Sequence, residues 1–196
     1  GAEASAPAPA QGNVLANWTF DETSGATAID ASGNGHNGAI VGDILIGQSE
    51  VRPGTAGSSY YFDGAGDQVT VPAGIDISNK SFTLAAWVKR DSLGTDYIMG
   101  QGPGTNNLKL HFGFRDADNA TLAFYADDSD HVDNPQYADT DGWHHLVATY
   151  NVADNTRHIY WDGVDQTPLT NNPASGPFLG TGQFDLGVAN GQFFQG

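Results

Sequence analysis

The sequence contains no cysteine and few basic residues. Its 196 residues include 7 Lys and Arg against 23 Asp and Glu, which gives a formal net charge of −16. Without cysteine, disulfides do not stabilise the fold and a thiol nucleophile is excluded. Because phosphate binding depends on clustered cations, we do not expect the chain to bind nucleic acid.

Long apolar runs are also missing. No stretch approaches the roughly 18 residues that span a bilayer, so no membrane span is predicted. The first residues, GAEASAPAPAQG, alternate Ala with Pro, which is typical of an extended linker. We therefore expect a linker over residues 1–12 and one domain over residues 13–196.

Glycine, proline and aromatic residues are plentiful, with 26 Gly, 9 Pro and 11% aromatics. Short β-prone runs are separated by turns rich in Gly, Asn, Asp and Pro, and no segment has convincing helical periodicity. The clearest strand is Ser81–Lys89, where Phe82 and Leu84 share one face and Thr83 and Trp87 the other. The spacing predicts an all-β, two-sheet antiparallel jelly-roll sandwich.

Two further local predictions concern the first half of the chain. Val14–Phe20 is β-prone and predicts the first strand. Tyr60–Phe62 and Gln68–Val71 flank an Asp-Gly pair at Asp63, a sequence that predicts a β-hairpin.

An ordered series of motifs runs through the domain. It comprises Trp18-x-Phe20-Asp21-Glu22-x-x-Gly25, Asp30-x-Ser32-Gly33-Asn34-Gly35, Phe62-Asp63-Gly64, Phe82-Thr83-Leu84-x-x-Trp87-Val88, Trp143-His144-His145-Leu146-x-x-Thr149-Tyr150 and Tyr160-x-Asp162-Gly163. In this order the motifs resemble the LamG-like (laminin G-like), concanavalin A-like jelly-roll domains of bacterial extracellular proteins. The resemblance implies a module of adhesins, surface proteins or carbohydrate-active enzymes, often with bound calcium. It also implies an extracellular, cell-surface or periplasmic location.

The same resemblance raises a question about the last strand. Family members usually continue past a segment such as Phe194-Gln195-Gly196 into a strand of the form Ile-Asp-x-Val-x-Ile-Tyr, which lies beside the first strand. The sequence stops at Gly196, so we expect Val14–Phe20 to offer a free edge that a complementing β-strand peptide could cover. The alternative is a domain that is stable without this strand.

The loop Asp30–Gly38 concentrates hard oxygen donors, which are the ligands that calcium prefers. We expect calcium there, with Asp30, Asn34, Asn37 and His36 as the first candidates and Asp21 and Glu22 as the second. The alternative is an Asx-turn loop without metal, because Asp and Asn favour turns in any case. A second acidic run, Asp127–Asn134, favours a solvated loop, and the alternative is a second calcium site or a clamp for sugar hydroxyls.

Catalytic signals are weak. The three glutamates are Glu3, Glu22 and Glu50, and no strand carries a Glu-x-Asp-x-x-Glu pattern suited to glycoside hydrolysis. No Gly-x-Ser-x-Gly motif occurs. His144 and His145 are neighbours on a predicted strand and should point to opposite faces, which argues against a shared zinc ion.

These observations predict an extracellular, calcium-dependent adhesion or recognition module that is not an enzyme and that binds a carbohydrate or a protein surface. The first alternative is a structural or split domain whose ligand is the complementing strand. The second is a polysaccharide-active enzyme or its accessory module. Sugar stacking would need an exposed aromatic residue, and by type the candidates are Trp87, Tyr97, Tyr137, Trp143 and Trp161.

Overall fold

The computed structural model describes residues 13–72, 74–105, 107–115, 118–124, 131–166 and 176–196. All regular structure in this part of the chain is β, as predicted, and no helix there is long and apolar enough to cross a membrane. The predicted linker over residues 1–12 lies outside the described residues, as do residues 127–130 of the acidic run. The second half of that run, predicted as a solvated loop, instead forms part of the strand β10 (His131–Gln136).

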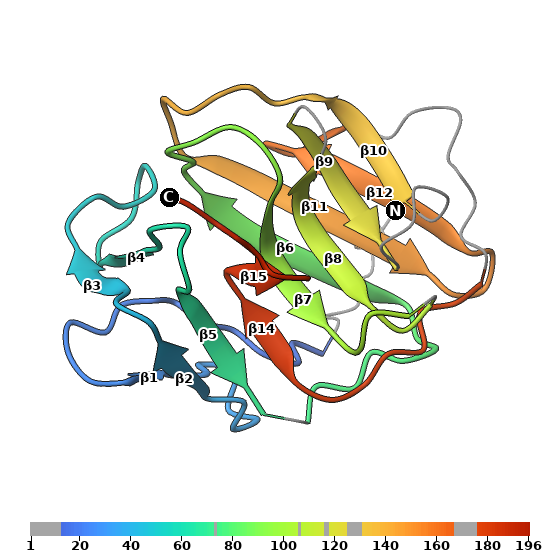
Figure 1. Ribbon diagram of the computed structural model, residues 1–196, viewed down its shortest axis with the longest axis horizontal. Coiled ribbons are helices and arrows are strands. Elements are labelled where there is room, and N and C mark those ends of the chain that lie inside the picture. Colours follow the sequence, from blue (N-terminus) through green and yellow to red (C-terminus); the bar gives the residue numbers. More distant parts are fainter. Residues whose placement is uncertain (1–12, 73, 106, 116–117, 125–130, 167–175) are drawn as a thin grey trace, which may run out of the picture.

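The larger sheet contains ten strands and forms one layer of the sandwich (Figure 1). Its strand order is β1-β2-β5-β14-β7-β8-β9-β10, and β16 pairs with β7 and with β15. The bounds are β1 Thr27–Ala28, β2 Gly38–Val41, β5 Gln68–Val71, β7 Asp96–Gln101, β8 Leu110–Arg115, β9 Asn119–Ala123, β10 His131–Gln136, β14 Phe184–Leu186, β15 Val188–Ala189 and β16 Gln192–Phe193.

The smaller sheet forms the second layer, with the order β13-β12-β11-β6. Its strands are β6 Phe82–Val88, β11 His144–Asn151, β12 Thr156–Trp161 and β13 Val164–Asp165. In β6 the buried and exposed positions alternate as the sequence predicts: Phe82 and Leu84 are buried, whereas Thr83 and Trp87 are exposed. At the edge of this sheet, β6 pairs only with β11 among the described strands.

The hydrophobic core fills the space between the layers. It includes Phe82, Leu84 and Leu146 from the small sheet and Phe112 and Phe184 from the large one. This arrangement explains the period-2 patterns, because each strand buries one face against the other sheet.

The hairpin predicted at residues 60–71 is wrong. The strand β4 (Ser59–Tyr61) pairs with β3 (Leu45–Gln48) in a separate two-stranded sheet, whereas β5 pairs with β2 and β14. The buried Asp67 carboxylate accepts hydrogen bonds from the backbone N–H groups of Asp43 and Asp63, at 2.8 and 2.9 Å. These bonds hold the turn in a shape that carries the chain from one sheet to the other.

The first predicted strand, Val14–Phe20, is also not a strand. Its only ladder contact within the described chain is an isolated bridge between Trp18 and Asp30. Burial nevertheless alternates, since Ala16, Trp18 and Phe20 pack against the core and the residues between them are exposed. The segment thus has the alternating side-chain pattern of a strand without a neighbouring strand to pair with.

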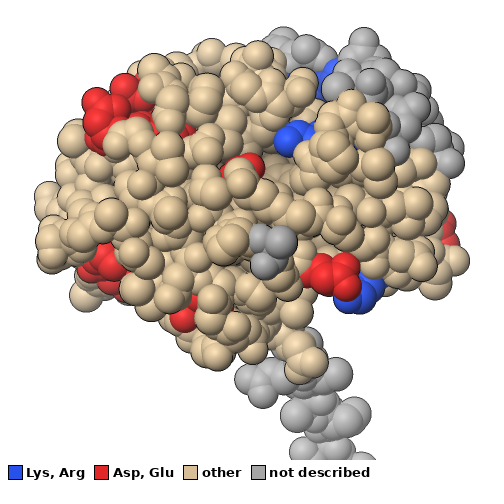
Figure 2. Space-filling view, turned by 60° about the horizontal axis from the view of Figure 1, so that its bottom comes forward, with Lys and Arg blue, Asp and Glu red and all other residues tan. Residues whose placement is uncertain are grey.

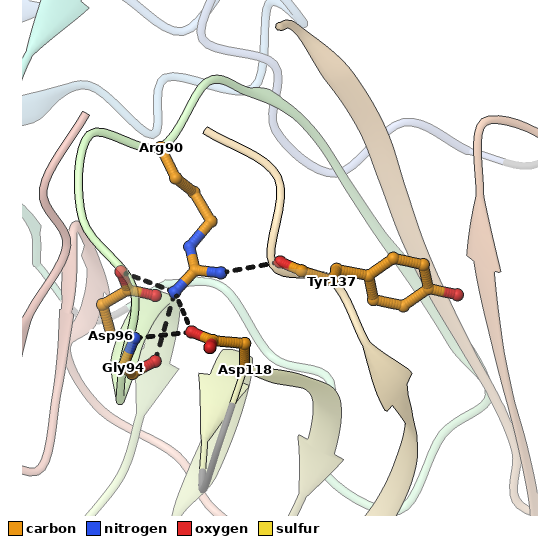
Figure 3. A network of polar contacts seen from close by, with 5 residues as sticks. All are labelled: Arg90, Gly94, Asp96, Asp118 and Tyr137. Carbon is orange, nitrogen blue, oxygen red and sulfur yellow. Dashed lines mark hydrogen bonds and ion pairs between the residues drawn. The ribbon is translucent and has the colours of Figure 1, made fainter. Parts of the chain in front are cut away.

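A buried ionic network secures the turn between β6 and β7 (Figure 3). The Arg90 guanidinium is 1% exposed and donates to the Asp118 carboxylate at 2.9 Å, to the Tyr137 carbonyl at 3.1 Å and to the Gly94 carbonyl at 3.2 Å. It pairs with Asp96 at 3.4 Å. Burial raises the pKa of Asp96 to about 7, against the lowering effect of Arg90.

Candidate functional site

A groove of about 1100 Å³ runs along the free edge of β6. One wall is β6 with its flanking residues, from Lys80 to Lys89, and the other is the segment Asn13–Asp21. Side chains of the large sheet also line it, including Met99, Phe184 and Leu186. The groove therefore opens the sandwich at the place where β6 has no partner strand.

The wall formed by residues 14–18 is held by the loop that follows Asp30. The Asp30 carboxylate accepts hydrogen bonds from the N–H of Asn17 at 2.9 Å, from the N–H and hydroxyl of Ser32 at 2.9 and 2.8 Å, and from the N–H of His36 at 2.9 Å. Burial raises the pKa of Asp30, but these hydrogen bonds together outweigh it and hold the pKa well below its usual range. The loop is thus an anchor for one wall of the groove.

The other predicted calcium ligands also have partners within the chain. Asn37 accepts from the Asp30 N–H at 2.8 Å, and the Asn34 amide donates to the carbonyls of Val14 and Leu15, both at 2.9 Å. The His36 carbonyl accepts from the indole N–H of Trp18 at 2.9 Å.

The two second candidates lie apart from these loop contacts. Glu22 accepts from the Ile29 N–H at 2.7 Å and from the Tyr60 hydroxyl at 2.8 Å, and Asp21 accepts from the Ser58 N–H at 3.0 Å.

These contacts bear on whether calcium fits the predicted residues. A carboxylate offers about four lone-pair positions, and at Asp30 four donors already fill them. A cation at Asp30 would have to displace at least one of these donors. Calcium at this loop therefore remains a prediction, and the geometry observed is that of a hydrogen-bonded loop.

A different group of carboxylates could hold a cation. Among the described residues, Asp43, Asp63 and Asp67 bring one oxygen each within 4.8 Å of one another. Asp43 and Asp63 are exposed, whereas Asp67 is 1% exposed and burial raises its pKa. The sequence signal for this group was the Asp-rich turn at residues 63–67, which the sequence alone associated only with a hairpin.

The outer face of the small sheet is the other candidate surface. The strand register places Trp87 opposite His145, Ala85 opposite Val147 and Thr83 opposite Thr149. Trp87 is 39% exposed, and its ring stacks on His145 at a centroid distance of 5.0 Å. The Arg52 guanidinium lies over the Trp87 ring at 5.3 Å.

The same face continues toward Thr83 with hydroxyl and amide groups. Thr83, Thr149, Asn151 and His158 line a shallow hollow of about 230 Å³ there. His158 pairs with Asp165 at 2.9 Å. A polar surface with one exposed indole at its end is suited to a ligand that has both hydroxyl groups and apolar faces.

The remaining aromatic candidates are less accessible. Tyr97 is buried and stacks on His111, whereas Tyr137 and Trp161 stack on each other at 4.1 Å. Trp143 is partly buried.

The two adjacent histidines face opposite sides of β11, as predicted. His144 lies on the side of β11 that faces the core, where its ring stacks on Trp161 at a centroid distance of 4.4 Å. It lies between the carboxylates of Asp139 and Asp162. His145 stacks on Trp87 on the outer face.

The surface charge is spread out. On the face drawn in Figure 2, acidic side chains form several separate groups and basic ones are few. The basic residues on the groove are partly neutralised, since Lys80 pairs with Asp76 and Lys89 with Glu50.

Comparisons with known proteins agree with this architecture. The solved structure of domain 4 of AbnA, a GH43 extracellular arabinanase from Geobacillus stearothermophilus in complex with arabinotriose, is 22% identical with a TM-score of 0.60, and the match covers 93% of this chain and 87% of that one. A Trypanosoma rangeli sialidase in complex with 2,3-difluoro-KDN is 16% identical with a TM-score of 0.59, over 89% of this chain. This chain spans only 28% of that sialidase. At these identities the likeness shows the fold alone.

A search of curated protein sequences found no match. A laminin G family model, described as the concanavalin A-like lectin/glucanases superfamily, matches residues 63–196, which is more than half of the chain. The resemblance that the motifs indicate is thereby confirmed. The chain belongs to the concanavalin A-like lectin/glucanase superfamily.

Proposed function

We propose that the chain is a non-catalytic, extracellular recognition module that binds glycans on the outer face of the small sheet. The observation that carries the proposal is the exposed Trp87, at the end of a face that also presents Thr83, Thr149 and His158. An indole supplies an apolar platform for a sugar ring, and hydroxyl and imidazole groups supply hydrogen bonds. The arabinotriose bound to the structurally similar arabinanase domain supports the same ligand class.

Arg52 has a defined part in this proposal. Its guanidinium covers one side of the Trp87 ring and His145 packs on that ring as well. A sugar that stacks on the indole would displace the guanidinium, which could then donate hydrogen bonds to sugar hydroxyls through its five N–H groups. Because Arg52 is itself exposed, it can leave the ring without opening the core.

The surroundings of the clustered carboxylates support a non-catalytic role. Glycoside hydrolysis needs two carboxyl groups that reach the substrate from either side of the scissile bond. Asp67 is buried beneath Asp43 and Asp63, and its oxygens accept backbone N–H groups. Asp96 and Asp118 are committed to the buried Arg90.

Calcium would have a structural part in this module. The cluster of Asp43, Asp63 and Asp67 offers three carboxylates, and calcium takes six to eight oxygen ligands from carboxylates, carbonyls and water. A cation there would offset the repulsion between these like charges and stabilise the crossover between β4 and β5. Calcium dependence of adhesion would then arise through the fold and not through direct contact with the glycan.

A glycan array in 1 mM calcium, followed by calorimetry with arabino-oligosaccharides, tests the function. We expect Trp87→Ala to weaken binding about twofold to tenfold, since stacking contributes about 0.5–1.5 kcal/mol. Leu93→Ala serves as the control, because Leu93 is also an exposed apolar residue, at 51% exposure, and is not on this face. Absence of binding to every glycan, or equal binding by both variants, would refute the proposal.

A second candidate function is acceptance of a β-strand from another polypeptide segment. The groove beside β6 favours it, because an edge strand with buried side chains is flanked there by a long hollow. This function and glycan binding would share part of one surface, because Arg52, Thr83 and Trp87 also line the groove. Amide hydrogen exchange along β6, with and without an added peptide, tests it directly.

A further inference from the structure

Three basic residues line the groove beside β6, and within the described chain only Arg52 among them has no ion pair. Lys80 pairs with Asp76. Lys89 pairs with Glu50. Because the chain has 7 Lys and Arg against 23 Asp and Glu, an exposed cation without an anion partner is an exception in this protein. The Arg52 guanidinium is therefore available to a negatively charged group of a ligand.

The position of Arg52 places this cation at the proposed glycan site. Its guanidinium lies over the Trp87 ring, 5.3 Å from the ring centroid. The same ring stacks on His145 at a centroid distance of 5.0 Å. The hydroxyl groups of Thr83 and Thr149 follow along the same face of the sheet. A sugar that stacks on Trp87 therefore lies next to the guanidinium.

We propose that the sugar stacked on Trp87 carries a carboxylate, as a uronic acid does, and that Arg52 binds this carboxylate. The inference rests on the proposed glycan-binding function and names its ligand class. Along β6, Trp87 and Thr83 are four residues apart, roughly 13 Å at 3.3 Å per residue. Neither Lys nor Arg lines the hollow at the Thr83 end. The site thus takes an oligosaccharide with a uronic acid at Trp87 and neutral sugars beyond it.

The strengths of the contacts decide which sugar gains from Arg52. A guanidinium that leaves the indole gives up a cation–π contact, which at an exposed site corresponds to about a twofold to fivefold change in a binding constant. A hydrogen bond to a neutral hydroxyl returns about twofold to tenfold, whereas a hydrogen bond to a charged group returns about tenfold or more. A carboxylate also accepts two parallel N–H groups of the guanidinium. A neutral sugar therefore roughly balances the lost contact, and a uronic acid exceeds it.

The negative charge of the protein limits how many carboxylates the ligand can carry. Glu50 pairs with the Lys89 ammonium, and the charges of Asp91 and Asp141 also act on that ammonium. Together with the formal net charge of −16, these groups repel a polymer that has a carboxylate on every sugar. Charges beyond about 8 Å are largely screened at 0.15 M salt, whereas a carboxylate in contact with Arg52 is not. We therefore expect uronic acids that occur singly and not in runs.

Matched pairs of oligosaccharides test the inference. The members of a pair differ only at carbon 6 of one sugar, with glucuronic acid against glucose, galacturonic acid against galactose and mannuronic acid against mannose. The pairs are screened on an array, and the pair that binds best is measured by calorimetry in 0.15 M salt. We expect the uronic member to bind about threefold to tenfold more tightly than the neutral one. Its methyl ester, which has no charge, should bind like the neutral member.

Variants of Arg52 supply the test on the protein side. Arg52→Gln should bring the two members of the pair to within about twofold of each other in affinity, because the carboxylate loses its charged partner. Arg52→Lys should keep only part of the preference, since an ammonium is a point charge without the planar fork. Lys80→Gln is the matched control and should keep the full preference, because it removes the same charge from a groove residue that already pairs with Asp76. Since Arg52 is exposed, its replacement should leave the fold intact.

The outcomes separate the inference from the function on which it rests. If arabino-oligosaccharides or neutral members bind through Trp87 and the uronic members bind no more tightly, the inference is wrong and the glycan-binding function stands. If no glycan of either kind binds, both are wrong. If the preference survives Arg52→Gln, another group holds the carboxylate and the inference is overturned. If a neutral member sulfated at carbon 6 binds as tightly as the uronic one, the site recognises negative charge alone and the assignment to a carboxylate is overturned.

Discussion

Two buried ionisable groups should make the stability of this protein depend on pH in opposite directions. Burial raises the pKa of Asp96 from 3.8 to about 7, with Arg90 lowering it and Asp118 raising it. Burial also lowers the pKa of His111 from 6.5 to about 4, and the positive charges of Lys109 and Arg115 add to this. Between pH 4 and 6.5 the folded state thus keeps a proton on Asp96 and excludes one from His111.

The sign of each effect follows from which state binds more protons. For Asp96 the folded state binds more, so its contribution to the free energy of unfolding falls as pH rises from about 4 to about 7. For His111 the unfolded state binds more, so its contribution rises with pH between about 4 and 6.5. A difference of one in pKa corresponds to about 1.4 kcal/mol, so each contribution changes by roughly 3 kcal/mol across this window.

The two contributions should nearly cancel in the wild-type protein and separate in variants. We expect Asp96→Asn to gain roughly 3 kcal/mol of stability relative to wild type as pH rises from 4 to 6.5. His111→Gln should lose a similar amount over the same window. Asp67, whose pKa burial also raises, adds the same background to all three proteins.

Urea unfolding followed by tryptophan fluorescence at half-unit steps between pH 4 and 7.5 measures these slopes. The slopes are compared at equal m-values, so that a change in the compactness of the unfolded state is not mistaken for a change in stability. Parallel curves for wild type and the two variants would refute the reasoning. They would mean that both groups titrate in the folded protein as they do in the unfolded chain.

Two further predictions concern the loop and the carboxylate cluster. Asp30→Asn should destabilise the protein by about 2–4 kcal/mol in urea at pH 7, because it weakens four hydrogen bonds to a buried carboxylate. The wild-type protein should lose this advantage over the variant as the pH falls below about 4. A urea unfolding midpoint that is the same in both proteins at pH 7 would contradict the prediction. Calcium at 100 times its Kd should stabilise the folded state by about 2.7 kcal/mol and raise the Tm by roughly 5–10 °C relative to the chelated protein. If Asp67→Asn loses this rise in Tm, the ion belongs to the cluster with Asp43 and Asp63. If only Asp30→Asn loses it, the ion belongs to the Asp30 loop. A wild-type Tm that chelation does not change would exclude calcium.

Strand content and fold class could be read from the sequence because they depend on local patterns. The alternation of Phe82, Leu84 and Val88 with Thr83 and Trp87 predicts a strand buried on one side wherever it lies, since side-chain direction has a period of two. The ordered motifs likewise led to the right superfamily. The opposite orientation of the adjacent His144 and His145 followed from the same periodicity.

Which strands pair, and which distant residues come into contact, were decided only by the tertiary structure. The sequence of Ser59–Tyr61 does not indicate that this strand pairs with β3 and not with β5. The turn after it is held by a long-range contact, in which the Asp67 carboxylate accepts a hydrogen bond from the backbone N–H of Asp43, 24 residues away. The same limit hid the carboxylate cluster and the Arg90 network, which combine residues from separate turns.

The segment Val14–Phe20 shows both sides of this division. Its sequence determined the alternation of Ala16, Trp18 and Phe20 toward the core, which is a property of the chain itself. Whether it became a strand depended on a neighbour with free backbone groups at the right distance. The tertiary structure instead binds it to the Asp30 loop and leaves a groove between it and β6, because hydrogen-bonded pairing is a property of two segments and not of one.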